Sequence, residues 1–100
     1  MKITYDENLQ KYMNENNLKD LVLDVITCST WAGIRREVSA RFAEKDEEEN
    51  LILSGYTCVE SEKGKIYYKK EHITFTDEVL FKLVNLYWTQ HIMISGVRSK

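Results

Sequence analysis

The feature that most constrains the fold is an apolar run in the first third of the chain. Residues 18–28 carry five Leu, Val and Ile side chains between Leu21 and Ile26, interrupted only by Asp24. A run of this length is typical of a strand that is covered on both faces. We therefore predict a central strand over residues 18–28.

The segment that follows predicts a second strand, because its polarity alternates. Between Ile34 and Phe42 apolar side chains alternate with polar ones, and Arg36 is the exception on the apolar side. A period of two places one set on the core and the other in water. A tight segment, Ser29–Gly33, joins the two predicted strands.

Periodicity and turn residues predict the remaining elements. The spacing of Leu9, Tyr12 and Met13 indicates a helix over residues 6–16. Five acidic residues make 44–49 a solvated loop. The later expectations are extended segments at 51–53 and 56–60, a turn at 62–65 into a strand at 66–69, a short strand at 73–75, a helix capped by Thr76 with apolar positions from Val79 to Tyr87, and a closing strand at 91–97.

These elements make the predicted fold class α+β. We expect a small, mostly antiparallel or mixed β-sheet, with an N-terminal helix and a second helix near the C-terminus. A chain of 100 residues is of the usual size for one domain, so we predict a single domain over residues 1–100.

Composition restricts the partners and the compartment. The formal charge of −2 offers no general attraction to nucleic acid or to an anionic membrane, so neither is expected as a partner. Residues 1–6 lack a signal-peptide stretch, and no window has the roughly 18 apolar residues of a membrane span. The expected location is the cytoplasm. Two cysteines are too few for a disulfide framework, so we expect reduced thiols.

The order of elements and three segments carry a family resemblance. The segments are LVLDVITCSTWAG (residues 21–33), GKIYYK (residues 64–69) and HIMISGV (residues 91–97). Over nearly the whole chain they resemble the HesB-like superfamily, which includes the A-type iron–sulfur cluster carriers. The likeness is greatest to its short members, in which a strand runs into a Cys-Ser-x-Cys-Cys-Gly-type motif. The resemblance implies a HesB-like fold and a protein of the iron–sulfur biosynthesis type.

The chain departs from the ligand pattern of that superfamily. The short motif matches at Cys28, Ser29 and Gly33, but Trp31 and Ala32 occupy the positions of the paired cysteines. The counterpart of the C-terminal Cys-Gly-Cys of the carriers is residues 95–97, Ser-Gly-Val. The resemblance therefore implies a degenerate ligand set on a retained architecture.

Metal binding requires soft ligands that converge on one point. This chain offers Cys28, Cys58, His72 and His91, all isolated in sequence. We expect no cofactor, with both cysteines as ordinary strand residues. The alternative is iron or an iron–sulfur cluster with Cys28 and Cys58 as metal ligands.

Several residues are candidates for contact with a protein partner or with a second copy in a homodimer. Trp31 either plugs the core or anchors a partner, and plugging is the favoured interpretation. Tyr67 and Tyr68 lie among lysines, although strand geometry alone explains them. Glu47, Glu48 and Glu49 either dock on a basic partner or only solubilise a loop.

The sequence contains no signature of catalysis. It has no Gly-rich phosphate loop, no H-E-x-x-H and no G-x-S-x-G. The expected function is that of a non-catalytic HesB-like protein with degenerate cysteine ligands. The alternative is a small acidic interaction or inhibitory module without metal.

Overall fold

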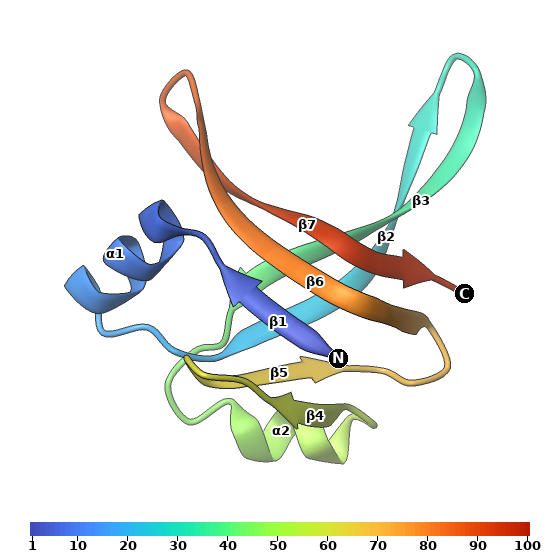
Figure 1. Ribbon diagram of the computed structural model, residues 1–100. Coiled ribbons are helices and arrows are strands. Elements are labelled where there is room, and N and C mark those ends of the chain that lie inside the picture. Colours follow the sequence, from blue (N-terminus) through green and yellow to red (C-terminus); the bar gives the residue numbers. More distant parts are fainter.

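The computed structural model describes residues 1–100, apart from the side chain of Leu86, and consists of seven strands and two helices (Figure 1). The strands form a three-stranded sheet with the order β1-β6-β7 and a four-stranded sheet with the order β3-β2-β5-β4. In chain order the elements are β1 (Lys2–Tyr5), α1 (Glu7–Glu15), β2 (Leu21–Thr30), β3 (Gly33–Phe42), α2 (Glu48–Leu53), β4 (Thr57–Glu60), β5 (Lys65–Tyr68), β6 (Ile73–Leu86) and β7 (Thr89–Ser99).

Strand β2 is central in the four-stranded sheet. It pairs with β3 in antiparallel fashion along its whole length, and with β5 in parallel at Leu21 and Val22 only. Beyond Val22 no strand other than β3 pairs with β2, and the far end of the β2–β3 pair projects from the body as a hairpin arm (Figure 1). The predicted central strand is confirmed, and so is the second strand, but the predicted core face of β3 begins only at Val38, because Ile34 is 75% exposed.

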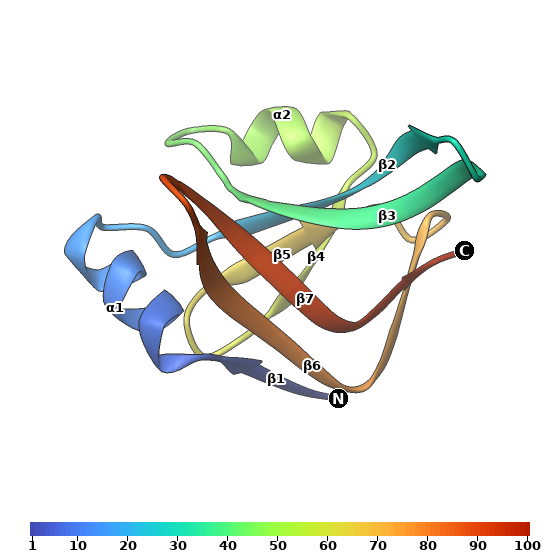
Figure 2. The ribbon, with the colours of Figure 1, turned by 90° about the horizontal axis from the view of Figure 1, so that it is seen from above.

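The two faces of β2 belong to different hydrophobic clusters. Leu21 and Leu23 are buried in the main core, which lies between the sheets and includes Leu9 of α1 and Phe81 of β6. Val22 points the other way, into a small cluster under α2. Figure 2 shows α2 on the side of this sheet that is turned away from β6 and β7. Both faces of β2 are thus covered at its start only, whereas the apolar run predicts cover along the strand: Ile26 is 43% exposed.

The three-stranded sheet is built on one long hairpin. β6 pairs with β7 in antiparallel fashion, and β1 lies parallel to β6 on the other side. The register shifts between Phe75 and Leu80, where β6 bulges opposite Gly96. Gly96 has a φ of +83°, and a Cβ atom there would lie 1.9 Å from the carbonyl oxygen of Glu78. The bulge therefore requires glycine at this position.

The predicted helix near the C-terminus is wrong, because residues 73–86 form β6. Val79, Phe81 and Leu83 are buried at a spacing of two and face the core, and β7 pairs with this strand along most of its length. Helical and strand patterns overlap in such an apolar stretch, and the pairing decides between them. The hydroxyl of Thr76, the predicted cap, lies 3.0 Å from the carbonyl oxygens of both Glu78 and Gly96 in the bulge.

Two further expectations need correction, and one element is additional. The acidic loop is confirmed over residues 44–47, but its last two residues and the predicted extended segment at 51–53 belong to α2. Leu51 anchors this helix in the small cluster, and Glu48 and Glu49 lie in its first turn. The sequence did not predict β1.

The predicted N-terminal helix is confirmed. Asp6 caps α1, because its side chain accepts a hydrogen bond of 2.9 Å from the amide of Leu9. In the described part of the chain, neither helix is long and apolar enough to cross a membrane.

Candidate functional site

Two hairpin arms rise from the same side of the body and diverge (Figure 1). The first, β2–β3, turns at Trp31 and Ala32, and the second, β6–β7, turns at Tyr87 and Trp88. The first turn is held by Thr30, whose Oγ1 accepts a hydrogen bond from the amide of Ala32 at 3.2 Å and donates one to the Gly33 carbonyl at 3.0 Å. The first tip is therefore a hydrogen-bonded turn.

The tips carry three exposed aromatic side chains. Trp31 is 99% exposed, Tyr87 93% and Trp88 91%. Aromatic side chains of this size contribute much of the energy of protein interfaces when a partner covers them. The prediction that Trp31 plugs the core is wrong, because the β2–β3 arm carries it away from the body. We define Trp31, Tyr87 and Trp88 as the hairpin-tip aromatics.

The two cysteines lie on different strands and do not meet. Cys28 is opposite Arg35 in the β2–β3 arm, whereas Cys58 is on β4, opposite Tyr67. Since Tyr67 in turn pairs with Val22, Cys58 is level with the start of β2. Cys28 is six positions further along β2, or about 20 Å at 3.3 Å per residue. Within one chain, the two thiols cannot hold the same metal ion.

The other candidate ligands do not complete a site for an iron–sulfur cluster. In the described part of the chain, no three His, Cys, Asp or Glu side chains gather in a way that could hold a metal ion. Among the described residues, the only hydrogen-bond partner of the Cys28 Sγ is a carboxylate oxygen of Glu37, at 3.8 Å. Residues 95–97, which correspond to the C-terminal Cys-Gly-Cys of the carriers, contain no thiol, and Gly96 is required by the bulge in β6. Clusters are held by several thiolates, so these residues do not fit one.

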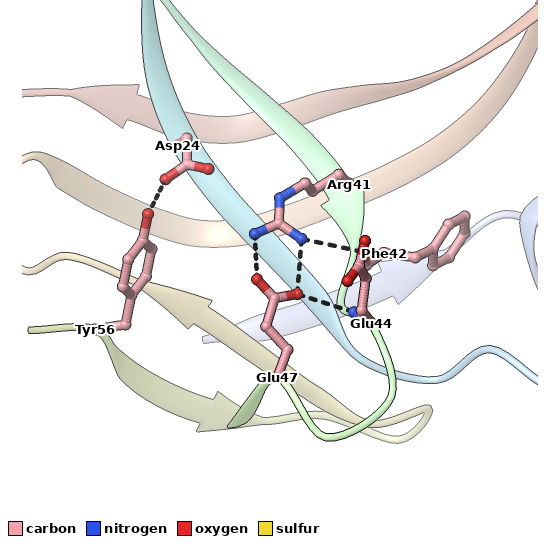
Figure 3. Close-up of polar contacts among 6 residues, drawn as sticks. All are labelled: Asp24, Arg41, Phe42, Glu44, Glu47 and Tyr56. Carbon is pink, nitrogen blue, oxygen red and sulfur yellow. Dashed lines mark hydrogen bonds and ion pairs between the residues drawn. The ribbon is translucent and has the colours of Figure 1, made fainter. Parts of the chain in front are cut away.

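A polar network ties the segment before α2 to the four-stranded sheet (Figure 3). Arg41 of β3 donates two hydrogen bonds, of 2.8 and 2.6 Å, to the two carboxylate oxygens of Glu47. Glu47 also accepts a hydrogen bond of 2.9 Å from the amide of Glu44. These donors lower the pKa of Glu47 to about 2. The bidentate geometry fixes the chain where it enters α2.

The second contact in Figure 3 joins Tyr56 to Asp24, whose carboxylate accepts a hydrogen bond from the phenol. Burial and the negative charge of Asp24 raise the pKa of Tyr56 to about 12. Neither Tyr56 nor Glu47 titrates near neutral pH, which is where a general acid or base is most effective. The arrangement suits a structural connection between α2, β2 and β3.

The remaining candidate residues are dispersed, and several are engaged within the chain. Tyr67 is 1% exposed and does not offer its side chain to a partner. Tyr68 is half-buried, with its ring edge-on to Phe75 at 4.7 Å. Glu48 forms an ion pair of 2.9 Å with Lys65, while Glu49 is exposed. None of these side chains lies on the arms.

Sequence reasoning placed Tyr87 on the apolar face of a predicted helix and did not single out Trp88. The turn between β6 and β7 contains no glycine, asparagine or aspartate to reveal it. Tyr87 itself adopts a φ of +57°, which is rare for an aromatic residue. The available signal was the strand-like spacing of Val79, Phe81 and Leu83.

Comparison with known proteins indicates the fold and leaves the ligands open. No family model matches the sequence, and no curated protein matches it. The structure is similar to the crystal structure of Escherichia coli SufA, which is involved in biosynthesis of iron–sulfur clusters. The TM-score is 0.50 at 12% sequence identity, and the match covers 95% of this chain and 80% of SufA. At this level of identity the similarity shows that the chain shares the overall fold of SufA.

Proposed function

We propose that this chain is a non-catalytic protein of the iron–sulfur biosynthesis type whose ligand set is degenerate, and that it acts by binding another protein. The shared fold with SufA supports the general class. The separation of Cys28 from Cys58, and the Ser-Gly-Val sequence at 95–97, support a role in which one chain does not carry a cluster.

The exposure of the hairpin-tip aromatics is the observation that carries the proposal. Large aromatic side chains left in water at the ends of two ordered arms add nothing to the core. When they are covered by a partner, each can bury about 150–250 Å². Two diverging arms can contact a partner at two separated points, as anchors of a bivalent attachment.

The acidic alternative receives less support from the geometry. The carboxylates of Glu47 and Glu48 are already paired with Arg41 and Lys65, so docking on a basic partner would compete with these ion pairs. The α2 segment is accordingly better suited to stabilising the four-stranded sheet than to serving as an inhibitory surface.

Site-specific photo-crosslinking in living cells tests the proposal. A photoreactive residue replaces Trp31 or Trp88 in separate variants, and Leu53, which is 78% exposed at the end of α2, serves as the matched control position. We expect both tip positions to crosslink the same partner, the control position to give none of that product, and Trp31→Ser to reduce crosslinking from position 88.

The identity of the crosslinked partner tests the rest of the proposal. A partner that works in iron–sulfur cluster biosynthesis supports the class. A partner from an unrelated process would contradict the biosynthetic role while leaving the arms as the binding surface. Equal crosslinking from all three positions, or none from the tips, would contradict the binding role itself.

A further inference from the structure

We propose that a hollow beside α2 binds a linear aliphatic diamine or polyamine. The hollow has a volume of about 540 Å³ and is lined by two loops and one strand. The lining consists of residues 17–20 after α1, residues 43–46 together with Glu48 at the start of α2, and Tyr67 of β5. None of the hairpin-tip aromatics lines it. We call this hollow the loop pocket.

Tyr67 supplies a buried polar atom that has no partner. The side chain is 1% exposed, and it packs with Val22 and Leu51 in the small cluster. Burial, and then the nearby carboxylate of Glu48, raise the pKa of Tyr67 to about 12, so the phenol stays neutral. None of the described residues, Glu48 included, is placed to form a hydrogen bond with the phenol oxygen. Buried polar groups are almost always hydrogen-bonded, so this oxygen marks a position for a ligand group.

The phenol end of Tyr67 is the part that faces the loop pocket. Glu48, which influences the phenol, is itself a lining residue, and so is Asp20, whose charge also raises the pKa of Tyr67. The ring of Tyr67 belongs to the small cluster on the other side. A ligand in the loop pocket is therefore on the side from which the phenol oxygen can be reached.

The lining of the loop pocket carries an excess of negative charge. It contains four carboxylates and two ammonium groups, those of Asp20, Glu44, Asp46 and Glu48 and those of Lys19 and Lys45. Glu48 forms an ion pair with Lys65, but among the described residues no ion pair engages the other three carboxylates. A hollow with this balance favours a positively charged ligand.

Main-chain hydrogen bonds hold the two loops in place. The amide of Ala43 donates a hydrogen bond of 2.9 Å to the carbonyl of Asp20, which joins one loop to the other. A carboxylate oxygen of Asp20 accepts a hydrogen bond of 2.9 Å from the amide of Lys65. The amide of Glu47 donates to the carbonyl of Glu44 at 3.1 Å, and its carboxylate accepts from the amide of Glu44 at 2.9 Å. The loop pocket is therefore preorganised, which reduces the cost of ordering it around a ligand.

The dispersion of the negative charges selects the class of cation. A metal ion needs several oxygen ligands within about 2–2.6 Å. Among the described residues, no three His, Cys, Asp or Glu side chains gather in that way. A linear diamine or polyamine carries ammonium groups at intervals along a flexible chain, so it can meet carboxylates that lie apart. One ammonium group would donate to the phenol oxygen of Tyr67, and the methylene groups would contact Leu18 and Ala43 of the lining.

Entry of such a ligand requires exposed side chains to move. The phenol oxygen of Tyr67 is closed off from water, so a ligand reaches it only by displacing a side chain. Lys19 and Lys45 are exposed lining residues, and no ion pair within the described part of the chain holds either of them. A bound polyamine repels both ammonium groups, so these lysines turn outward when it enters.

Calorimetric titration of the full chain with spermidine, at fixed ionic strength, tests the inference. Tyr67→Phe removes only the phenol oxygen. Glu44→Gln/Asp46→Asn removes two negative charges, and asparagine tolerates the φ of +66° at position 46. We expect spermidine to bind the wild type, and to bind each of these variants about tenfold more weakly, because each change removes a contact with a charged group.

Two further variants are the matched controls. Tyr68→Phe removes the phenol oxygen of the neighbouring tyrosine, which does not line the loop pocket. Glu71→Gln/Asp77→Asn removes two negative charges from exposed residues that also lie outside the lining. We expect both controls to bind spermidine as tightly as the wild type does.

The stability of Tyr67→Phe without ligand provides a second readout. Because the phenol oxygen has no partner within the described part of the chain, we expect the urea midpoint of this variant to equal or exceed that of the wild type. Spermidine should raise the midpoint of the wild type more than that of Tyr67→Phe. Trp31→Ser should leave the affinity for spermidine unchanged, so failure of the crosslinking test and failure of this one are distinguishable.

Five outcomes would overturn the inference. They are the absence of spermidine binding at millimolar concentration, equal weakening in the control variants, a lower urea midpoint for Tyr67→Phe, binding of Mg²⁺ that needs the same side chains and excludes spermidine, and binding of Nα-acetyl-lysine amide as tight as that of spermidine. The last result would assign the loop pocket to the single ammonium group of a partner's lysine.

Discussion

Substitution of Gly96 by alanine tests whether the bulge in β6 organises the three-stranded sheet. Two costs combine at this position. A φ of +83° is in the left-handed region, which costs a residue with a Cβ atom about 1–2 kcal/mol. In addition, the Cβ atom would lie 1.9 Å from the Glu78 carbonyl oxygen, so backbone must move, at about 1–3 kcal/mol. We expect Gly96→Ala to lower the free energy of unfolding by about 2–5 kcal/mol.

Gly55→Ala is the matched control. Gly55 has a φ of +95°, but a Cβ atom there would meet no described atom within 4 Å. It therefore pays only the conformational cost, about 1–2 kcal/mol. Both variants gain the same small benefit from a less flexible unfolded chain. The difference between them isolates the close approach to Glu78.

Urea denaturation followed by circular dichroism measures both variants. For a slope of about 1–2 kcal/mol per molar urea, the midpoint for Gly96→Ala should lie about 1 M below that for Gly55→Ala. Equal midpoints would refute the reasoning, because they would mean that the carbonyl of Glu78 yields without cost and the bulge does not need glycine.

Three further predictions concern the aromatic and ionisable side chains. Trp31 and Trp88 are the two tryptophans of the chain, and both are more than 90% exposed. We therefore expect the tryptophan emission maximum and the quenching by acrylamide to be the same in the native and the unfolded protein. A native emission maximum at shorter wavelength would contradict the exposure of the arms. The pKa of Glu47 is about 2 in the folded chain against a usual 4.5, so its pairing with Arg41 stabilises the fold above about pH 5, and this contribution is lost as the pH falls towards 2. Since both side chains keep contact with water, Arg41→Gln should cost about 1 kcal/mol at pH 7 and flatten this acid dependence in urea titrations, and an unchanged acid profile would contradict the pairing. The pKa of Tyr56 is raised to about 12, so its contribution is present below pH 10 and is lost as the pH rises towards 12; Tyr56→Phe should remove that alkaline loss, and an identical loss would show that its phenol is not protected.

Strand pairing explains most of what the sequence could predict. The apolar run at Leu21–Ile26 and the alternation at 34–42 identify β2 and β3, and burial follows the patterns at Leu21–Leu23 but not at Ile26 and Ile34, which are exposed. The N-terminal helix was equally legible, since Asp6 is a good cap and Leu9 and Met13 face the core. The family resemblance implied a fold related to the iron–sulfur cluster carriers, and the chain shares its overall fold with SufA.

The errors arise where local patterns are ambiguous and tertiary contacts decide. The stretch from Val79 to Leu83 satisfies both a helical and a strand period, and only its pairing with β7 selects the strand. The acidic residues at 44–49 looked unable to pack, but Arg41 and Lys65 neutralise two of them and Leu51 anchors the helix that follows. Arg41 and Lys65 lie outside the acidic segment, so the composition of that segment does not reveal the two ion pairs.

The candidate site was predictable only in part. Trp31 was singled out correctly as unusual, but its exposure depends on how far the β2–β3 pair extends beyond β5, which no local pattern encodes. The separation of Cys28 and Cys58 likewise follows from the order and register of β2, β5 and β4.

The most direct test of the central claim is the iron and acid-labile sulfide content of protein purified without oxygen from iron-supplemented cells, alongside Cys28→Ser. The account predicts that both proteins are folded and colourless and contain no stoichiometric iron or sulfide. Stoichiometric iron and sulfide in the wild type that is lost in Cys28→Ser would contradict it, and would show that the chain carries a cluster despite its degenerate ligands.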